Sequence, residues 1–441
     1  MLDGGRTTHS TFGIPYNLDA DSVSSITFRD KRAAILIKSK LIIVDEASMA
    51  SAHMVDVIDK LLRELTRNSR VPFGGKTILF AGDFRQTLSI VQYGRESEII
   101  ANCFKNAKTW RDMVQFELTE NMRANADEIE FKNWLIQIGD GTIPSSHVSD
   151  LNKIELDQRV VLNLANATAN REQNAKNIKH TMEEKLVDYV YGDKVTAQSL
   201  IEQNISILSP LNVDVDQINQ IVLDRMYEEQ EKTYLSTDTH IQEEEDELET
   251  FQQEHLNAET PSGFPHHVLN VKVGGIVILL KNLNLSKGQA NGSRVQVTRL
   301  YNNLIEGKIA FGPYAGEIVL IPRYEFNSNE GSRLPFKMQR IQFPIRLAFA
   351  MTINKSQGQT FRRIGVYLPA PVFSHGQLYV ALSRVRSFND VKVLVKNTTS
   401  HGQLIPPKNK DQRQKKITPS NILPTYTDNV VYRYIFTMNQ G

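Results

Sequence analysis

Two short apolar runs end in polar residues whose types suit phosphoryl transfer. Leu41–Val44 is followed by Asp45 and Glu46, and Thr77–Ala81 leads through a glycine to Gln86. One carboxylate can hold hydrated Mg²⁺, while a second orients the attacking water. The Gln86 amide is both a donor and an acceptor, so it could sense a γ-phosphate. Two acids after a strand are also common at an ordinary solvated turn, which leaves both interpretations of the first run open.

The residues between these runs predict the element that positions them. Apolar residues recur at helical spacing: Met54, Val55, Ile58, Leu61, Leu62 and Leu65. Strand, helix and strand then form a right-handed crossover, and ligands collect at the carboxyl ends of such parallel strands. The sequence therefore predicts an α/β fold with both acidic turns on one rim of a parallel sheet.

Seven segments give the chain a resemblance to a known family. They are GGRTTHSTFGIP (4–15), LIIVDEASM (41–49), FGGKTILFAGDFRQ (73–86), LTENMR (118–123), SILSPLNVDVDQIN (206–219), FPIRLAFAMTINKSQGQTF (343–361) and YVALSRVRS (379–387). In this order they resemble the motifs of Pif-type (petite integration frequency) DNA helicases of superfamily one. The chain is most similar to the helicase part of Helitron-type transposons and their cellular and viral relatives, and the resemblance to the family runs from about residue 4 to about residue 396.

The resemblance implies roles for the residues of the first two runs and for two arginines. Asp45 would bind Mg²⁺ and ATP, Glu46 would be the catalytic base, and Gln86 would couple the γ-phosphate to DNA. Arg123 and Arg384 would be arginine fingers, which neutralise transition-state charge and are worth roughly 10³–10⁵ in rate. An ordinary surface or ion-pair role is the alternative for each arginine.

Residues 352–360 (TINKSQGQT) form a polar run around Gly358. Hydroxyls, amides and backbone N–H groups of this kind can hold a single-strand backbone without reading its bases. We expect Lys355, Ser356 and Gln357 to contact DNA and Gly358 to lie at the nucleotide. A helix N-terminal cap with a glycine turn would be equally polar.

Thr8, His9 and Ser10 would meet the same DNA strand from the first motor domain. His9 could instead be a buried, hydrogen-bonded histidine, and no zinc-type spacing accompanies it. Arg386 remains open between a phosphate contact and a surface position.

The printed sequence contains no phosphate loop of the pattern GxxxxGK[ST]. The pairs Gly75–Lys76 and Gly307–Lys308 lack the required preceding residues. In the family this loop lies upstream of the first matching segment, so the sequence predicts an N-terminally truncated helicase. We expect this chain alone to hydrolyse ATP poorly.

Three functions compete at this stage. The first is an ATP-dependent 5′–3′ helicase acting on single-stranded and forked DNA, as the family resemblance implies. The second is a non-catalytic single-stranded DNA-binding remnant of a transposon helicase, and the third is an RNA-directed motor. Related proteins act in telomere maintenance, DNA recombination and repair, or transposition.

The expected fold is two RecA-like parallel-sheet motor domains, the first incomplete, with a small β-barrel insertion in the second. We expect a partial first motor domain (1–125), followed by a helical connecting region (126–204) and by the start of the second motor domain with an acidic linker (205–264). The barrel (265–338), the remainder of the second motor domain (339–396) and a C-terminal tail (397–441) complete the chain.

Composition is that of an ordinary globular chain. The 441 residues carry a net charge of +1, so DNA binding would need a local basic groove rather than an overall positive charge. Cys103 is the single cysteine, which excludes an internal disulfide and suits a reducing compartment. No apolar run approaches the roughly 18 residues of a membrane span. We expect an intracellular protein, nuclear if the source is eukaryotic.

Overall fold

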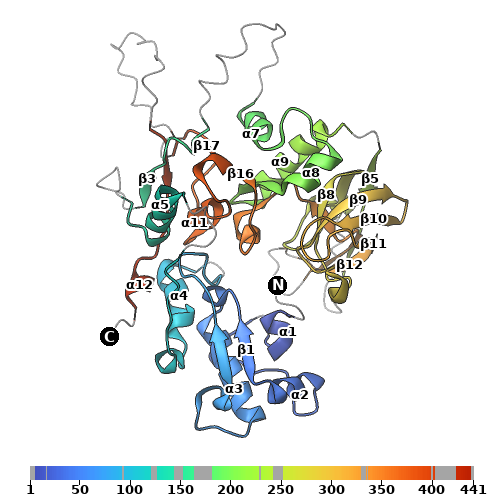
Figure 1. The fold of residues 1–441 in the computed structure, drawn as a ribbon. Coiled ribbons are helices and arrows are strands. Elements are labelled where there is room, and N and C mark those ends of the chain that lie inside the picture. The colour runs from blue at the N-terminus through green and yellow to red at the C-terminus, as the bar shows by residue number, and fades with distance from the viewer. Residues whose placement is uncertain are drawn as a thin grey trace, which may run out of the picture.

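The computed structural model describes residues 5–15, 17–91, 94–120, 127–143, 152–162, 181–227, 230–241, 252–328, 334, 336–398, 401–402 and 424–438. Figure 1 shows the first motor region in blue at one end of the molecule, the second motor region in green and red, and the inserted strands in yellow beside it.

The predicted strand–helix–strand unit is present. Strand β1 (Leu41–Val44) pairs in parallel with β2 (Thr77–Phe80), and helix α3 (Ala52–Leu65) connects them. The Ser51 hydroxyl caps α3 by accepting a hydrogen bond from Met54 N. The apolar stripe of α3 packs into the core of this region, as its spacing predicted.

Shorter elements surround this pair of strands. They are α1 (Thr8–Phe12), α2 (Lys31–Lys38), η1 (Ala47–Met49), η2 (Pro72–Gly75), α4 (Glu96–Ala101), η3 (Phe104–Asn106) and η4 (Trp110–Asp112). Among the described residues this sheet has two strands. The side chains of Leu41, Ile43 and Leu79 are roughly half exposed, so part of its apolar surface is uncovered.

The second motor region contains a four-stranded parallel sheet. Its order is β15 (Ala350–Thr352), β4 (Ile205–Ser209), β16 (Arg363–Leu368), β17 (Val391–Val395). Helices α5 (Ile129–Asp140) and α11 (Gln377–Leu382) share one buried cluster with it, and α7 (Met182–Tyr191), α8 (Ala197–Gln203) and α9 (Asn212–Arg225) share another. Apolar side chains on both faces explain why these strands read as continuous hydrophobic runs. This is the RecA-like arrangement that the sequence predicted.

The inserted region forms an antiparallel sheet. Its order is β11 (Ile318–Pro322), β10 (Leu304–Ile309), β9 (Arg294–Leu300), β8 (Ile276–Leu279), β14 (Ile345–Leu347). Asn291 and Gly292 lie at the end of the connection from β8 to β9, with Gly292 at φ +91°. The described strands pair in this linear order, so closure into a barrel stays a prediction.

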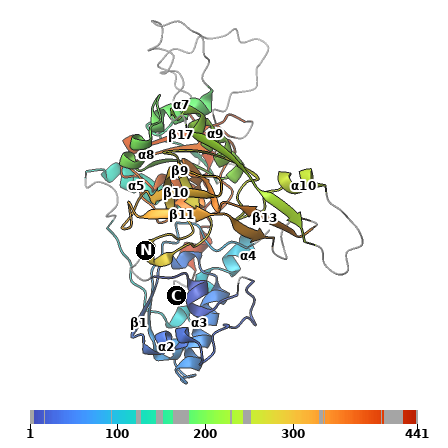
Figure 2. The same ribbon diagram turned by 90° about the vertical axis from the view of Figure 1, so that its right-hand side faces the viewer.

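A three-stranded ribbon extends from this sheet to one side (Figure 2). It consists of β12 (Tyr324–Asn327), β13 (Met338–Gln342) and β6 (Thr237–His240), while β5 (Glu231–Leu235) pairs with β7 (Val268–Lys272). Arg340 and Asp238, both fully buried, form an ion pair of 2.6 Å within it. The insertion therefore continues past the predicted boundary at residue 338, and the chain rejoins the motor sheet at Ala350.

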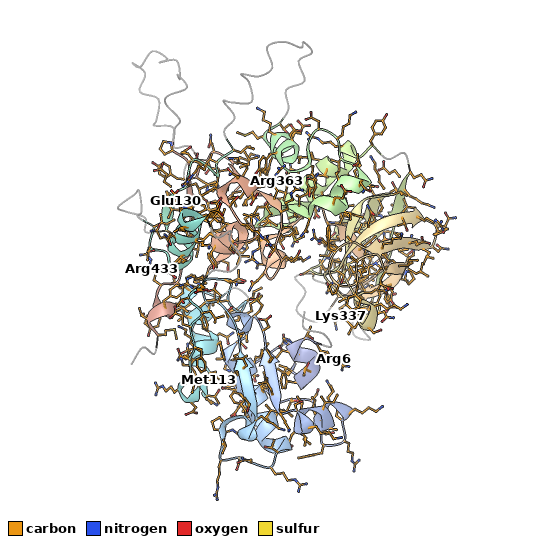
Figure 3. All side chains as sticks on the ribbon, viewed as in Figure 1. Arg6, Met113, Glu130, Lys337, Arg363 and Arg433 are labelled. Carbon is orange, nitrogen blue, oxygen red and sulfur yellow. The ribbon has the colours of Figure 1, made fainter. Side chains whose placement is uncertain are left out.

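Residues 424–438 pack back onto the molecule, which the prediction of a C-terminal tail did not anticipate. Strand β18 (Tyr426–Asp428) pairs with β3 (Lys153–Glu155), and α12 (Tyr434–Thr437) follows. The Lys105 ammonium donates to Ile435 O at 2.8 Å. Arg433, labelled in Figure 3, donates to Gly141 O at 2.6 Å. This segment therefore ties the first motor region to the helical connection.

The remaining described elements are α10 (Gln253–Ala258), η5 (Leu285–Lys287), η6 (Ile353–Ser356) and η7 (Phe388–Asp390). None of the described helices combines the length and apolar character that crossing a bilayer needs.

Candidate nucleotide site and nucleic-acid interface

The two acids after β1 lie at a sharp turn. Glu46 has φ +53°, a left-handed conformation that is uncommon outside glycine. Its N–H donates to Asp45 Oδ1 at 2.9 Å, which holds this turn. Asp45 is exposed and Glu46 half-buried. The exposed carboxylate suits a hydrated cation, and the half-buried one suits a water-orienting base.

The loop after β2 approaches this turn closely, as the shared rim predicted. Ala47 N donates to Ala81 O at 2.8 Å. A Cβ on Gly82 would lie 2.8 Å from Ser48 N, so only glycine permits this approach. Two buried side-chain atoms at this site, Gln86 Oε1 and Ser48 Oγ, have no hydrogen-bond partner among the described residues. Buried polar atoms without partners are what a bound ligand or water would satisfy.

Gln357 connects these two loops from the second motor region. Its Nε2 donates to Glu46 Oε2 at 2.9 Å, and its Oε1 accepts from Thr87 Oγ1 at 2.6 Å. Gly358 follows at φ +74°, where a Cβ would lie 3.6 Å from Glu46 Oε1. Gln357 was predicted to contact DNA; here both ends of its amide are engaged at the acidic site. Gly358 lies beside Glu46, where the nucleotide was expected.

Three residues that sequence reasoning missed hold the β2 loop from the second motor region. His375 Nε2 lies 2.8 Å from Phe84 O, and Tyr379 donates its hydroxyl hydrogen to Asp83 Oδ2 at 3.0 Å. A Cβ on Gly376 would lie 2.4 Å from Arg85 O. Tyr379 falls in a matched motif segment, but its sequence position does not reveal a partner 296 residues away.

Burial shifts the pKa of both titratable groups in this contact. Burial lowers the pKa of His375, and its Nδ1 accepts a hydrogen bond from Tyr432 N at 2.8 Å. His375 is therefore neutral and donates through Nε2 to Phe84 O. Burial, followed by the Asp83 charge, raises the pKa of Tyr379. Tyr379 is thus a stable hydrogen-bond donor to Asp83.

The two predicted arginine fingers have different outcomes. Arg384 is fully buried, and its guanidinium donates to Val380 O, Gln359 O and Ser383 Oγ at 2.7–3.0 Å. These three acceptors belong to its own motor region, next to the segment that contacts Glu46, and its role as a finger stays a prediction. Arg123 lies outside the described residues. Arg386 is exposed.

The three DNA contacts predicted in the first motor region lie on α1. Thr8 lines a hollow of about 580 Å³ that also reaches Asp45. Ser10 is exposed, and its N–H donates to the capping Thr7 hydroxyl at 3.4 Å. His9 is half-buried, and burial lowers its pKa. Thr8 and Asp45 therefore line the same hollow, and the DNA role of Thr8, His9 and Ser10 stays a prediction.

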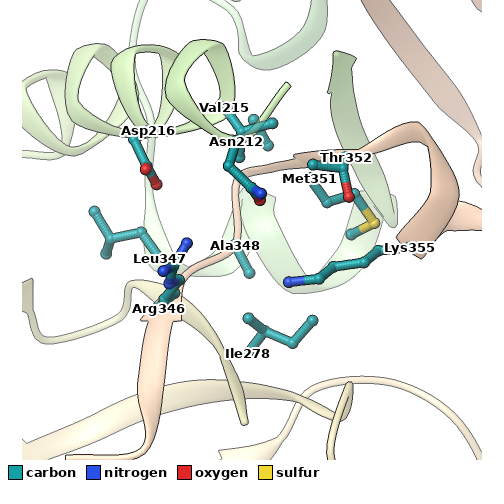
Figure 4. Close-up of a pocket in the computed structure, with 11 residues that line it drawn as sticks. Asn212, Val215, Asp216, Ile278, Arg346, Leu347, Ala348, Met351, Thr352 and Lys355 are labelled. Carbon is teal, nitrogen blue, oxygen red and sulfur yellow. The ribbon is translucent and has the colours of Figure 1, made fainter. Parts of the chain in front are cut away.

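Ser356 and Lys355 separate in the structure. Ser356 is fully buried and its hydroxyl donates to Ile353 O at 2.7 Å, so the predicted DNA contact by this side chain is wrong for this conformation. Lys355 instead lines a second hollow together with Arg346, Asn212 and Thr352 (Figure 4). The polar run 352–360 thus divides between the acidic site and this hollow.

The donors at the acidic site fit a magnesium nucleotide better than a protein-bound metal. Within the described ranges, no three His, Cys, Asp or Glu side chains gather as a metal-binding group. Asp45 would therefore supply one ligand, and water and phosphate oxygens the others, as is usual for Mg²⁺.

Two family models match the chain. One, described as PIF1-like helicase, matches residues 1–149, and one, described as DNA helicase Pif1, 2B domain, matches residues 254–300. The second lies across the inserted strands.

Curated relatives share moderate identity. The ATP-dependent DNA helicase PIF1 of Danio rerio is 28% identical over 397 residues, covering 89% of this chain and 52% of the relative. The ATP-dependent DNA helicase PIF7 of Trypanosoma brucei brucei is 25% identical over 419 residues, covering 86% of this chain and 39% of the relative. The chain thus spans about half or less of these two relatives.

Solved structures agree in fold. A structure of two coordinating Pif1 helicases at forked double-stranded DNA matches with 26% identity and a TM-score of 0.59, covering 92% of this chain and 80% of that one. Bacteroides Pif1 bound to single-stranded DNA matches with 25% identity and a TM-score of 0.58, covering 92% and 82%.

Proposed function

Because this chain belongs to the Pif1-type family of superfamily-one helicases, we propose that it is the motor part of an ATP-dependent 5′–3′ helicase that acts on single-stranded and forked DNA. The observation that carries the proposal is the bridge from Gln357 to Glu46 and Thr87. The bridge joins the predicted catalytic carboxylate to a segment of the other motor region. Binding or hydrolysis of ATP beside Glu46 would therefore change the same hydrogen bonds that hold the two motor regions together.

The chain's own residues divide the work at this site. Asp45 would hold Mg²⁺, which neutralises charge on the phosphates when ATP is bound. Glu46 orients the attacking water and takes its proton through whichever carboxylate oxygen Gln357 leaves available. Gln86 contacts the γ-phosphate through its amide N–H groups, and its Oε1, which has no protein partner in the described part of the chain, can accept a hydrogen bond from the attacking water. Arg384 acts as a finger after leaving its buried pose, and Arg123 supplies the second.

A further part of the proposal concerns this exact polypeptide. Since the printed sequence contains no GxxxxGK[ST], residues 1–441 by themselves turn ATP over poorly. The second candidate is a single-stranded DNA-binding remnant of a transposon helicase. We also propose an intracellular location, nuclear in a eukaryote.

ATP hydrolysis by residues 1–441, measured with and without oligothymidylate, separates these functions. Low turnover together with single-stranded DNA binding supports the remnant for this chain. Vigorous DNA-stimulated turnover would refute the ATPase defect and support the motor, whose polarity is then read from forks with either a 5′ or a 3′ tail. Absence of DNA binding would refute both.

A further inference from the structure

Two side chains of strand β9 extend from the inserted sheet and hold helix α8 of the second motor region. Gln296 Nε2 donates to Ala197 O at 2.9 Å, where α8 begins, and Arg294 Nη2 donates to Asn204 Oδ1 at 2.6 Å, where α8 ends. Strand β9 lies beside this helix in both ribbon views (Figure 1 and Figure 2). The inserted sheet therefore contacts the motor region at both ends of one short helix.

Arg294 is a costly residue to place at this contact. Its side chain is buried, with the guanidinium carbon 4.0 Å from the centre of the Phe311 ring and 5.2 Å from that of Phe361. Among the described residues its partners are these rings and the Asn204 amide rather than a carboxylate. Burial lowers the pKa of Arg294 to about 10, so the group is still charged at neutral pH. Aromatic faces offset part of the desolvation cost, but a buried cation is weak evidence for stability, which points to another role.

Asn204 connects Arg294 to the segment that reaches Glu46. It has φ +42°, a left-handed conformation that asparagine tolerates better than most residues. Its Nδ2 donates to Thr360 O at 2.9 Å, and its backbone O accepts from Arg362 N at 3.1 Å. One side-chain amide thus accepts from Arg294 at one end and donates to Thr360 at the other.

A second buried guanidinium holds the same segment. Arg384 Nη1 donates to Gln359 O at 3.0 Å, and Arg384 O accepts from Phe361 N at 2.9 Å. Residues 359–362 are therefore held at successive backbone groups, directly after the glycine that follows the bridging glutamine. Fixing this stretch fixes the point from which the glutamine amide reaches Glu46 at 2.9 Å.

We infer that Arg294 is a positioning residue for the acidic site. It acts through Asn204 and Thr360 on the segment that carries Gln357, and these contacts form a relay from Arg294 to Glu46. The inference rests on the proposed function, because it concerns the carboxylate that orients the attacking water there. Movement of the inserted sheet away from α8 breaks the first hydrogen bond of the relay and loosens the segment. The inserted sheet thereby regulates the catalytic carboxylate through the second motor region.

Hydrogen exchange of residues 1–441, followed by mass spectrometry without nucleotide or DNA, tests the relay. In Arg294→Met, the amides of residues 357–362 should exchange about tenfold faster, because a hydrogen bond to a charged group contributes at least that factor. Residues 46–49, beyond the glutamine bridge, should also exchange faster. A side chain that only stabilises the inserted sheet would change exchange in that sheet and leave residues 46–49 at the parent rate.

Two matched variants separate the relay from a loss of packing. Arg299→Met removes a largely exposed arginine from the same strand, and it should leave both segments at the parent rate. Asn204→Asp keeps an acceptor for Arg294 and a side chain suited to left-handed backbone, but it has no N–H to donate to Thr360 O. It should therefore accelerate exchange in residues 357–362 as Arg294→Met does. Asn204→Asp also keeps the test valid if Arg294→Met does not fold.

Each outcome decides the relay. Unchanged exchange of residues 357–362 in Asn204→Asp would overturn it, and so would faster exchange in Arg294→Met that is confined to the inserted strands. Either result leaves the proposed function standing, because that function is tested by DNA binding and ATP turnover. A chain that shows the relay but binds no DNA would refute the proposed function and leave the relay standing.

Discussion

Gly376→Ala tests whether the second motor region positions the loop that carries Gln86. Gly376 has φ +70°, and a Cβ there would lie 2.4 Å from Arg85 O and 2.7 Å from the Gln86 carbonyl carbon. Gly263 provides a matched control, because it has φ +84° in a turn closed by Phe264 N and Pro261 O, and a Cβ there would meet nothing within 4 Å.

The two substitutions share one cost and differ in another. Left-handed backbone costs alanine about 1–2 kcal/mol, and this is the whole expected effect at Gly263. At Gly376 the new methyl overlaps backbone atoms, and overpacking of this kind adds about 1–3 kcal/mol. Each kcal/mol lowers the melting temperature of a domain of this size by roughly 2–4 °C.

Thermal unfolding followed by circular dichroism measures this difference. Gly376→Ala should melt several degrees below Gly263→Ala, and hydrogen exchange in residues 83–86 should accelerate in the first variant alone. Equal melting temperatures together with unchanged exchange in that loop would refute the argument that α11 buttresses it.

Three further predictions concern single contacts. Arg340→Met should cost about 3–5 kcal/mol of unfolding free energy because Asp238 stays buried without its partner, and a matched Asp238→Leu/Arg340→Met double variant should recover most of that loss in thermal melting. Gln357→Ala and Glu46→Ala should couple by about 1.5–3 kcal/mol in a double-mutant cycle on unfolding, and additive effects would contradict the bridge. Because burial lowers the pKa of His375 in the folded state, its contribution to stability is complete above pH 6.5 and declines as pH falls from there toward the lower folded pKa. His375→Gln should therefore flatten the fall of melting temperature between about pH 6.5 and 5, and an unchanged slope would contradict its neutral, doubly bonded state.

Local sequence determined the elements that carry the acids. The apolar runs before Asp45 and Gly82 predicted two strands, and the apolar stripe between them predicted a helix. Together they predicted a parallel pair of strands whose polar ends share one edge of the sheet. These patterns could be recognised because they depend only on residues that are close in sequence. Residue types at the rim indicated phosphate chemistry before any tertiary contact was known.

The tertiary structure alone decided which side chains meet across the two motor regions. Gln357 reaches Glu46 across 311 positions of sequence, and Lys355, two residues earlier, lies instead in the hollow with Arg346. A polar run predicts that its members bind something, but the short helical turn η6 directs consecutive side chains to different sides. The partner of each side chain therefore depends on how the regions pack, which no local pattern encodes.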